Sequence, residues 1–380
     1  MIDARHKDWL SVNQALLTGE LDVLKAGLRR RIDGLLTQES EAAGSEQDHS
    51  TDTDGSAAKP ASALDRLSTA FGLSKFERNV VLLCAGVELD SAFGGLCAAA
   101  QGDSTRHYPT FSLALAAVPE AHWSALAPNA PLRRWRLIEA GTGPSITVAP
   151  LRIDEPVLNY LTGSALWDER LAAIVEPLAI PNAGDLAPSQ AEIARSIAQS
   201  WSRAAGQPIL PVVELSANDP EDGRPIAAAA TAALGLNAVA ISSDLIPAAA
   251  QELQAFGCLW EREAALNSCL LLIECGGATE DARYRSVARF AERTGGLIVL
   301  SSREPVRIRR PCIRFSVVPA GAAERRAAWL SALSGAQGCA PARLDAIASQ
   351  FSVGMEAIRS IAARAVSVAP PGTDVVAAAW

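Results

Sequence analysis

Residues 208–235 read PILPVVELSANDPEDGRPIAAAATAALG and decide the fold of this chain. The apolar start of this stretch, residues 208–215, predicts a buried parallel strand, and its alanine-rich end, residues 226–235, predicts a helix. The polar residues between them stand where a phosphate-binding loop of the form GxxxxGKS/T joins a strand to a helix. The stretch therefore predicts either a nucleotide-binding α/β domain or an ordinary strand–loop–helix unit.

The loop at residues 216–225 lacks the groups that bind nucleotide. Such a loop needs glycines for close backbone approach, a lysine for the β- and γ-phosphates and a hydroxyl for magnesium. When it is aligned on Gly223, Asn218 stands for the first glycine, Arg224 for the lysine and Pro225 for the hydroxyl residue. Three carboxylates in the loop would also repel a triphosphate: Asp219, Glu221 and Asp222. The sequence predicts a degenerate phosphate loop.

Two further apolar segments predict strands of the same sheet. The segment at 268–277, SCLLLIECGG, carries Glu274 and Cys275 where a nucleotide hydrolase would carry Asp-Glu, one acid for magnesium and one for water activation. A cysteine cannot replace a general-base carboxylate without help. The segment at 295–304, GGLIVLSSRE, ends in polar residues that include Ser302. Three apolar strands alternating with helical stretches predict a doubly wound parallel sheet.

Composition narrows the function classes. A chain of 380 residues is long enough for two or three domains. The net charge of −8 argues against a protein whose main partner is nucleic-acid backbone. No apolar run reaches 18 residues and the N-terminus lacks a signal-peptide core, so we expect no membrane span and a cytoplasmic protein. The seven cysteines form no CxxC pair, which predicts buried free thiols and no metal site.

The N-terminal part predicts helices around an acidic linker. Apolar residues at helical spacing over 7–36 predict two amphipathic helices with a break near Thr18 and Gly19. Residues 38–62 are acidic and poor in large apolar groups, so we expect a disordered linker. Several further helices are predicted over 64–126.

Within that helical stretch, Ser74 and Glu77 have capping-box spacing. The segments 132–140 and 146–153 then predict a β-hairpin around a Gly- and Pro-containing turn. Helices followed by such a hairpin are typical of a winged-helix domain. Trp123 is expected in its core, since tryptophan is usually buried.

The C-terminal part predicts a small helical lid. Residues 320–335 predict one helix and residues 341–369 predict two more. The last residues, DVVAAAW (374–380), remain alanine-rich and helical without a capping signal. We therefore expect the chain to be part of a longer protein.

Taken together, these segments resemble the N-terminal half of bacterial AAA-family ATPases. The resemblance is carried by FGLSKFERNVVLLCAGVELD, PTFSLALAAVPEAHWSAL, PLRRWRLIE, LRIDEPVLNYLTG, SSREP and AAERRAAWLSAL. Such proteins combine an N-terminal winged-helix region, a degenerate first AAA module and an active second one, and some are similar to the ATPases of contractile injection systems. The resemblance implies ATP hydrolysis by the second module in a hexameric ring, with the first module serving assembly or substrate handling.

The resemblance and the loop alignment together nominate the candidate site. The nucleotide-binding candidates are Asn218, Gly223, Arg224, Glu274 and Ser302, the last at the place of a polar residue that senses the γ-phosphate. Arg307, Arg309 and Arg310 lie where these rings place an arginine that reaches the neighbouring subunit, and we favour Arg309 and Arg310 for an inter-subunit contact. No catalytic residue and no metal ligand is assigned. ATP with magnesium is the one cofactor left open.

The predicted architecture is a helical winged-helix region followed by an α/β, P-loop-like, AAA-type domain with a small helical lid. The predicted boundaries are 1–37 for N-terminal helices, 38–62 for the linker, 63–185 for the winged-helix-like domain, 186–318 for the α/β core, 319–370 for the lid and 371–380 for a further segment.

The preferred function is a non-catalytic assembly and substrate-recognition region of an AAA-type ATPase. Its partners would be protein clients or sister subunits, in a homo-oligomeric full-length protein without nucleic acid or membrane. One alternative is a weakly active ATPase, in which Arg224 and Glu274 replace the usual groups. Another is a winged-helix DNA-binding regulator that uses Arg133, Arg134 and Arg136 on phosphates. The predicted helix at 109–126, however, contains no lysine or arginine.

Overall fold

The chain divides into two compact units, residues 1–168 and residues 169–380, in a computed structural model. The structure describes residues 4–40, 61–164, 166–182, 184, 186–207, 209–276, 281–333, 346, 350 and 354–368. Residues 41–60 of the predicted linker, part of the predicted lid and the predicted last segment, 371–380, lie outside these residues. The predicted linker bounds of 38–62 are too wide, because the first helix extends to Ser40 and Ser62 caps the next helix. None of the described helices combines the length and the apolar character needed to cross a membrane.

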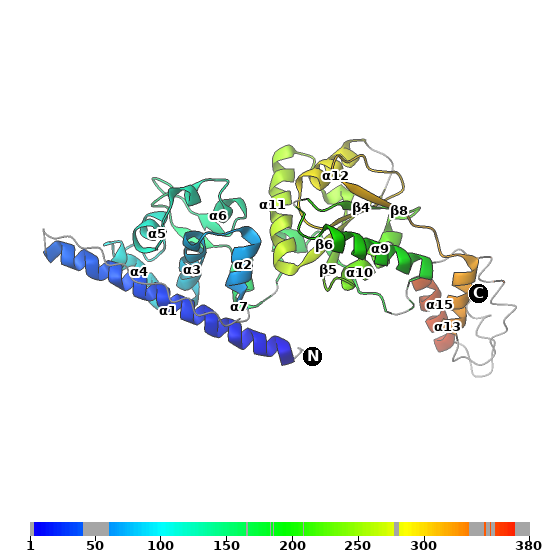
Figure 1. Cartoon of the computed structure of the whole chain (residues 1–380), viewed down its shortest axis with the longest axis horizontal. Coiled ribbons are helices and arrows are strands. Elements are labelled where there is room, and N and C mark those ends of the chain that lie inside the picture. The colour runs from blue at the N-terminus through cyan, green and yellow to red at the C-terminus, as the bar shows by residue number, and fades with distance from the viewer. Residues whose placement is uncertain are drawn as a thin grey trace. The chain divides into compact units, whose positions relative to one another are not determined.

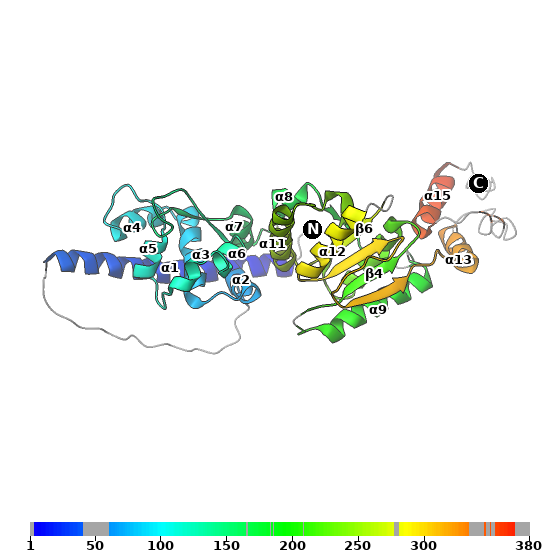
Figure 2. The ribbon, with the colours of Figure 1, turned by 90° about the horizontal axis from the view of Figure 1, so that it is seen from above.

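The first unit is built on one long helix, α1 (Ala4–Ser40), seen in Figures 1 and 2. The predicted break near Thr18 is wrong, because the Thr18 hydroxyl donates to the Gln14 carbonyl, 2.9 Å away, within a continuous helix. Glycine disfavours a helix by only about 1 kcal/mol, a penalty that side-chain burial outweighs. The buried side chains of α1 face the unit: Leu17, Leu21, Leu24 and Leu28.

Four shorter helices pack beside α1. They are α2 (Ala63–Phe71), α3 (Lys75–Leu89), α4 (Ala92–Ala100) and α5 (Phe111–Ala117). The predicted capping box at the start of α3 is confirmed, with the Glu77 backbone N–H donating to Ser74 and the Ser74 backbone N–H donating to Glu77. A second box at Ser62 begins α2 in the same way.

The predicted hairpin is present but shorter than expected. Its strands are β1 (Ile138–Ala140) and β2 (Leu151–Ile153), paired antiparallel. Residues before β1 form the helical turn α6 (Pro131–Arg134) instead of a strand, since proline favours the first turn of a helix. Helix α7 (Glu155–Thr162) follows β2.

The expectation that Trp123 lies in the core is wrong. The residue belongs to a 3-10 turn, η1 (Trp123–Leu126), and its side chain is 84% exposed. Only Ala125 of this turn is buried. The turn is too short to present an apolar stripe, so a single residue can point outward without disturbing the rest.

The second unit contains a six-stranded sheet. Its strands are β3 (Glu176–Pro177), β4 (Val212–Ser216), β5 (Asn237–Ser242), β6 (Cys269–Cys275), β7 (Ile298–Ser302) and β8 (Cys312–Ser316). They lie in the order β3-β5-β6-β7-β4-β8, with all neighbours parallel except β3 and β5. The three predicted strands correspond to β4, β6 and β7. Strands β3, β5 and β8 were not predicted.

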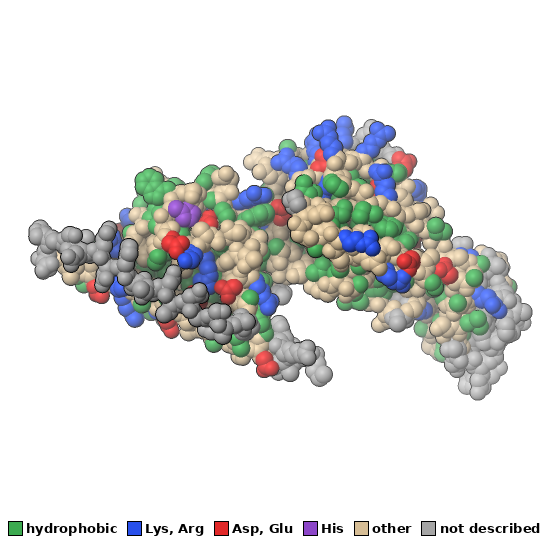
Figure 3. Space-filling model, viewed as in Figure 1, with side chains coloured by type: hydrophobic (Ala, Val, Ile, Leu, Met, Phe, Trp, Pro, Cys, Tyr) green, Lys and Arg blue, Asp and Glu red, His purple; other side chains and the backbone are tan. Residues whose placement is uncertain are grey.

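Helices cover both faces of this sheet. They are α9 (Pro188–Ala204), α10 (Gly223–Ala232), α11 (Ala250–Asn267) and α12 (Asp281–Arg293), and the one-turn helix α8 (Glu169–Ala172) precedes β3. Helices α9 and α10 bury Trp201 and Ile226 against Val213 and Leu215 of β4. Figure 2 shows α9 on one side of the sheet and α12 on the other. Basic side chains gather over α12 in Figure 3.

A small helical group follows β8, as predicted. Its described helices are α13 (Ala322–Ala332) and α15 (Met355–Val368). Trp329 and Ile358 form a buried cluster with Ala187, which precedes α9. The helix expected near the start of 341–369 falls mostly outside the described residues.

Candidate functional site

The carboxyl ends of β4, β6 and β7 meet at one edge of the sheet. Ser302, at the end of β7, is in register with both Ser216 of β4 and Cys275 of β6. Parallel strands end on the same edge, which is where α/β proteins commonly bind ligands. All five nucleotide-binding candidates therefore lie at or next to this edge, on the loop after β4, the start of α10 and the ends of β6 and β7.

Arg224 and Glu274 form a two-pronged ion pair at the centre of this edge. The guanidinium donates from Nε to Glu274 Oε1, 2.7 Å away, and from Nη2 to Oε2, 2.9 Å away. Its third nitrogen, Nη1, donates to Glu176 Oε2 of β3 at 2.9 Å. The hydrogen bonds to Glu274, the largest cause, and to Glu176 raise the pKa of Arg224 well above its ordinary value although burial opposes them. Glu274 itself is buried.

The loop before α10 is folded back onto β7. Arg303 donates from Nε and Nη2 to the Asn218 carbonyl, at 3.1 and 2.9 Å. The Ala217 N–H donates to the Ser302 carbonyl at 3.0 Å. A short 3-10 turn, η2 (Pro220–Asp222), then leads directly into α10. The loop backbone is thus committed to contacts within the chain.

Gly223 allows α10 to approach β7 closely. A Cβ atom added at Gly223 would lie 2.6 Å from Ser301 Oγ and 2.9 Å from Ser301 Cβ. Only glycine fits this approach, because real Cβ atoms do not come so near to other heavy atoms. The glycine therefore permits contact between two elements, whatever it does for a ligand.

The polar groups at the ends of β6 and β7 are buried. Burial raises the pKa of the Cys275 thiol to about 12, with further contributions from Glu214 and Glu274. The thiol is therefore protonated at neutral pH and cannot accept a proton from water. The hydroxyl oxygens of Ser301 and Ser302 are buried and have no hydrogen-bond partner among the described residues.

The three arginines before β8 have different surroundings. The Arg310 guanidinium is buried and donates to four backbone carbonyls, those of Leu210, Ala291, Thr294 and Gly296. Its burial lowers the pKa of Arg310. Arg307 and Arg309 are exposed. Arg310 therefore links the end of α12 to Leu210, just before β4. Arg309 lies at the surface.

Arg133 and Arg134, which belong to α6, have contacts within the first unit. Arg133 Nη1 donates to the Leu126 carbonyl at 2.8 Å, and Arg134 lies over the Trp135 ring, 4.6 Å from its centre. Arg136 has a positive φ of 50°. Among the described residues there is no group of three or more His, Cys, Asp or Glu side chains that could hold a metal.

Sequence patterns did not reveal the partners of the candidate residues. Glu176 lies in a two-residue strand, and Arg303 follows a strand end without any motif. The one available signal was charge: Arg224 and Glu274 are opposite charges on segments expected to meet at one edge. That signal placed the two charges at the same edge, but it did not show that their side chains would pair.

Two family models match parts of the chain. The model described as winged helix domain, variant, matches residues 37–175. The model described as contractile injection system ATPase helical domain matches residues 321–380. Residues 321–380 are thus similar in sequence to the helical domain of those ATPases. The second match associates the chain with the ATPases of contractile injection systems, and the first agrees with the predicted winged-helix region.

Other comparisons add little. No curated protein matches the chain. Among solved structures, a Rhizobiales Trip13 chain is 16% identical, with a TM-score of 0.31. The aligned region covers 50% of this chain and 87% of the Trip13 chain.

Proposed function

We propose that this chain is a non-catalytic assembly and substrate-recognition region of a bacterial AAA-type ATPase, associated with a contractile injection system. The two family matches support the association with such ATPases. The observation that carries the non-catalytic part is the ion pair between Arg224 and Glu274. Its partners would be sister subunits or protein clients.

The ion pair argues against hydrolysis because it uses both groups that a nucleotide would need. A magnesium nucleotide requires a carboxylate for the metal and a cation for the phosphates. Here each carboxylate oxygen of Glu274 accepts from Arg224, so the cation and the acid neutralise each other. The residues at this edge do not fit a magnesium nucleotide.

Water activation would also fail. The position after Glu274 holds the protonated thiol of Cys275, which cannot act as a general base at neutral pH. Pro225, in the first turn of α10, supplies neither an N–H nor a hydroxyl to a phosphate. The loop is instead held by Arg303. We infer that the residues at this edge hold α10 and its preceding loop against β6 and β7.

A weakly nucleotide-binding module is the second candidate, favoured by one observation. The Arg224 side chain is 30% exposed and is a cation at the lysine position, so in this candidate a phosphate replaces Glu274 as its partner. This candidate predicts that nucleotide binding depends on Arg224.

Hydrolysis tests the non-catalytic part. Phosphate release from Mg-ATP by the purified chain should equal the buffer background, for wild type and for Arg224→Ala alike. A rate above background that disappears in Arg224→Ala would overturn the proposal. A rate that persists in Arg224→Ala would indicate a contaminating enzyme and calls for repurification before the comparison.

Sedimentation velocity tests the assembly part. The chain should self-associate as its concentration rises, and Arg309→Glu should weaken this association, because Arg309 is the exposed member of the predicted inter-subunit pair. Arg289→Glu, an exposed arginine on α12, is the matched control. Equal weakening by both variants would contradict an inter-subunit role of Arg309.

A further inference from the structure

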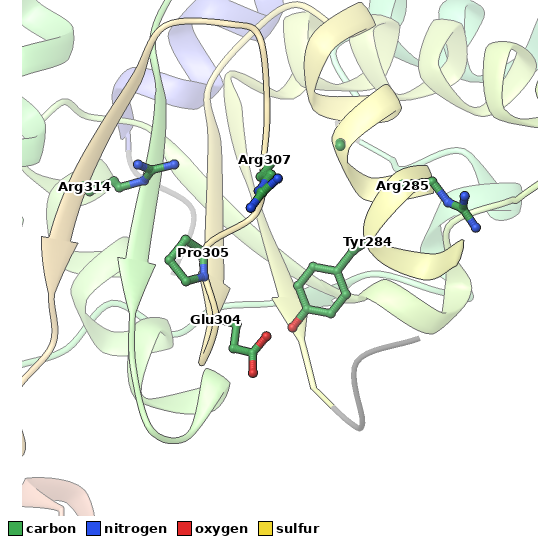
Figure 4. Close-up of a pocket in the computed structure, with 7 residues that line it drawn as sticks. Tyr284, Arg285, Glu304, Pro305, Arg307 and Arg314 are labelled. Atoms are coloured by element: carbon green, nitrogen blue, oxygen red, sulfur yellow. The ribbon is translucent and has the colours of Figure 1, made fainter. Parts of the chain in front are cut away.

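A pocket of 890 Å³ opens beside the sheet, between α12, the segment after β7 and strand β8 (Figure 4). Neither Arg224 nor Glu274 lines it. Its volume lies in the range of sites that hold small ligands, about 300–1,000 Å³. The described residues that line it are Tyr284, Arg285, Ala288, Glu304, Pro305, Arg307 and Arg314.

A buried carboxylate beneath the pocket fixes one of these arginines. Glu214, in the middle of β4, has no exposed side-chain surface. Its Oε2 accepts from Arg314 Nε at 2.5 Å and its Oε1 accepts from the Val306 N–H at 2.5 Å. Arg314 is therefore oriented before any ligand arrives, which reduces the entropy lost on binding. Its Nη groups make no hydrogen bond to the described residues, and its side chain is 56% exposed.

A second guanidinium borders the same space. Arg307 is exposed and forms no ion pair or hydrogen bond with any described residue. In Figure 4 it lies between Arg314 and Tyr284. Arg285 points away from the other labelled residues in this view and has interactions of its own. The donors left for a ligand thus come from Arg307 and Arg314.

The charge of the lining favours a single carboxylate over a polyphosphate. Glu214 offsets Arg314, and Glu304 borders the same pocket, so a ligand with several negative charges would meet repulsion. A guanidinium binds one carboxylate with two parallel hydrogen bonds. The balance of charge is therefore sufficient for one acid group.

The rest of the lining is apolar or uncharged. Ala288, Pro305 and the Tyr284 ring supply apolar surface. Burial, followed by neighbouring negative groups, raises the pKa of Tyr284, so its hydroxyl remains a donor at neutral pH. In Figure 4 that hydroxyl points toward Glu304. A ligand that combines an acid with a short apolar stem would contact both kinds of surface.

We propose that this pocket binds a peptide carboxylate on a short apolar stem, either a glutamate side chain or a C-terminal carboxylate. Arg307 and Arg314 would bind the acid, and Pro305 with Tyr284 would contact the stem. The carboxylate is argued from the pocket alone, whereas the choice of a peptide as its carrier rests on the proposed recognition function.

Fluorescence anisotropy with three labelled leucine-containing hexapeptides tests the proposal. One carries a central glutamate and an amidated end, one a central glutamine and a free C-terminal carboxylate, and one a glutamine and an amidated end. At least one charged peptide should bind about tenfold more tightly than the neutral peptide, as expected for charge-assisted hydrogen bonds. The stronger of the two identifies the source of the carboxylate. Equal binding of all three, or no binding, would overturn the proposal.

Variants connect this binding to the pocket. Arg307→Gln should reduce binding of the charged peptide to the level of the neutral one. Arg289→Gln, at an exposed arginine of α12 that does not line the pocket, should leave it unchanged. Arg314→Gln is made together with Glu214→Gln, because the single change would leave a buried carboxylate without its cation. Circular dichroism melting confirms that each variant is folded.

Two outcomes would contradict the pocket or its selectivity. Equal weakening by Arg307→Gln and Arg289→Gln would show that general surface charge holds the peptide. Displacement of the peptide by inorganic phosphate at lower concentration than by glutarate would show that the site prefers phosphate. Neither result depends on whether the chain hydrolyses ATP, so failure here is distinguishable from failure of the proposed function.

Discussion

Arg224 is the residue on which the account depends. Its position at the start of α10 directs the guanidinium toward the end of β6, where Glu274 accepts two hydrogen bonds. A lysine could make only a point contact there, whereas the planar guanidinium matches a carboxylate in two places. The substitution of arginine for lysine at the loop therefore changes the preferred partner from phosphate to an acid of the same chain.

Breaking this pair should destabilise the second unit. Arg224→Ala leaves the buried Glu274 carboxylate without its main donor, and we expect the free energy of unfolding to fall by about 2 kcal/mol. The value is below that of a fully buried pair because the Arg224 side chain is partly exposed. Urea unfolding followed by circular dichroism measures it.

The double variant Arg224→Ala with Glu274→Ala provides the control. Once both partners are absent, no unpaired charge remains, so the double variant should lose about 1 kcal/mol less than the sum of the single changes. Additive losses would show that the two side chains are not coupled.

A second residue-scale prediction concerns Gly223. Gly223→Ala would place a Cβ atom 2.6 Å from Ser301 Oγ, so we expect a loss of about 1–3 kcal/mol in unfolding free energy. Gly34→Ala, in helix α1 with nothing near its added Cβ, should instead stabilise the first unit by about 0.5–1 kcal/mol. Adding Ser301→Gly to Gly223→Ala should restore part of the loss, and no restoration would contradict the close contact.

At the scale of elements, long apolar runs were predicted well and short or edge strands were not. Strands β4, β6 and β7 are almost wholly buried, and each contains an apolar run that marks it in the sequence. The edge strand β8 contains Arg314, whose partner Glu214 lies 100 positions earlier, so no local pattern marks it. Strand β3 has two residues and exists only through its pairing with β5.

The positions of the candidate site residues were predicted, but their contacts were not. The sequence placed Asn218, Gly223, Arg224, Glu274 and Ser302 on segments that the parallel order brings to one edge. It could not show that Arg224 would turn to Glu274, because side-chain direction depends on the approach of α10 to β6. The pocket beside β8 was not predicted at all, since Glu214, which binds Arg314 of the pocket lining, is a single polar residue in a buried strand.

The lid offers a prediction at this scale. Glu324, in the first turn of α13, accepts from the Gly321 N–H at 2.9 Å and from the Ser189 N–H at 3.0 Å. Glu324→Gln should weaken the attachment of α13 to α9 by about 1 kcal/mol, as for the loss of a helix cap. Hydrogen exchange should then become faster in α13 and stay unchanged in α11. Equal acceleration in both helices would contradict a local role.

The same contact has a pH dependence whose sign is fixed. Burial of the Glu324 carboxyl acts to raise its pKa. Hydrogen bonds from the Gly321 and Ser189 N–H groups outweigh this effect and lower the pKa of Glu324 below its ordinary 4.5. The carboxylate therefore stabilises the attachment above that value, and the contribution is lost as the pH falls through the lower folded-state pKa. The protection factors of the α13 amides, which correct for the pH dependence of intrinsic exchange, should fall on acidification, and Glu324→Gln should remove this dependence.

At the scale of the whole molecule, the buried thiols predict sensitivity to alkali. Burial raises the pKa of Cys97 to about 11 and those of Cys269 and Cys275 to about 12, from an ordinary 9.0. Their contribution is complete below about pH 9, and it is lost as the pH rises toward the folded-state pKa values, because unfolded thiols ionise first. The urea midpoint should fall between about pH 9 and about pH 11 in the presence of a reductant.

Substitution isolates the thiols from the other groups that titrate in this range. The combined variant Cys97→Ala and Cys269→Ala should show a shallower decline with pH than the wild type. An identical slope would assign the decline to lysine and tyrosine side chains and contradict the prediction.

The central claim is that this chain does not bind or hydrolyse nucleotide at the edge of its sheet. Calorimetric titration with Mg-ATP tests the claim most directly. We predict no saturable heat for the wild type at nucleotide concentrations on the order of millimolar, since Arg224 is held by Glu274. Saturable heat that disappears in Arg224→Ala would contradict the account and establish the edge of the sheet as a nucleotide site.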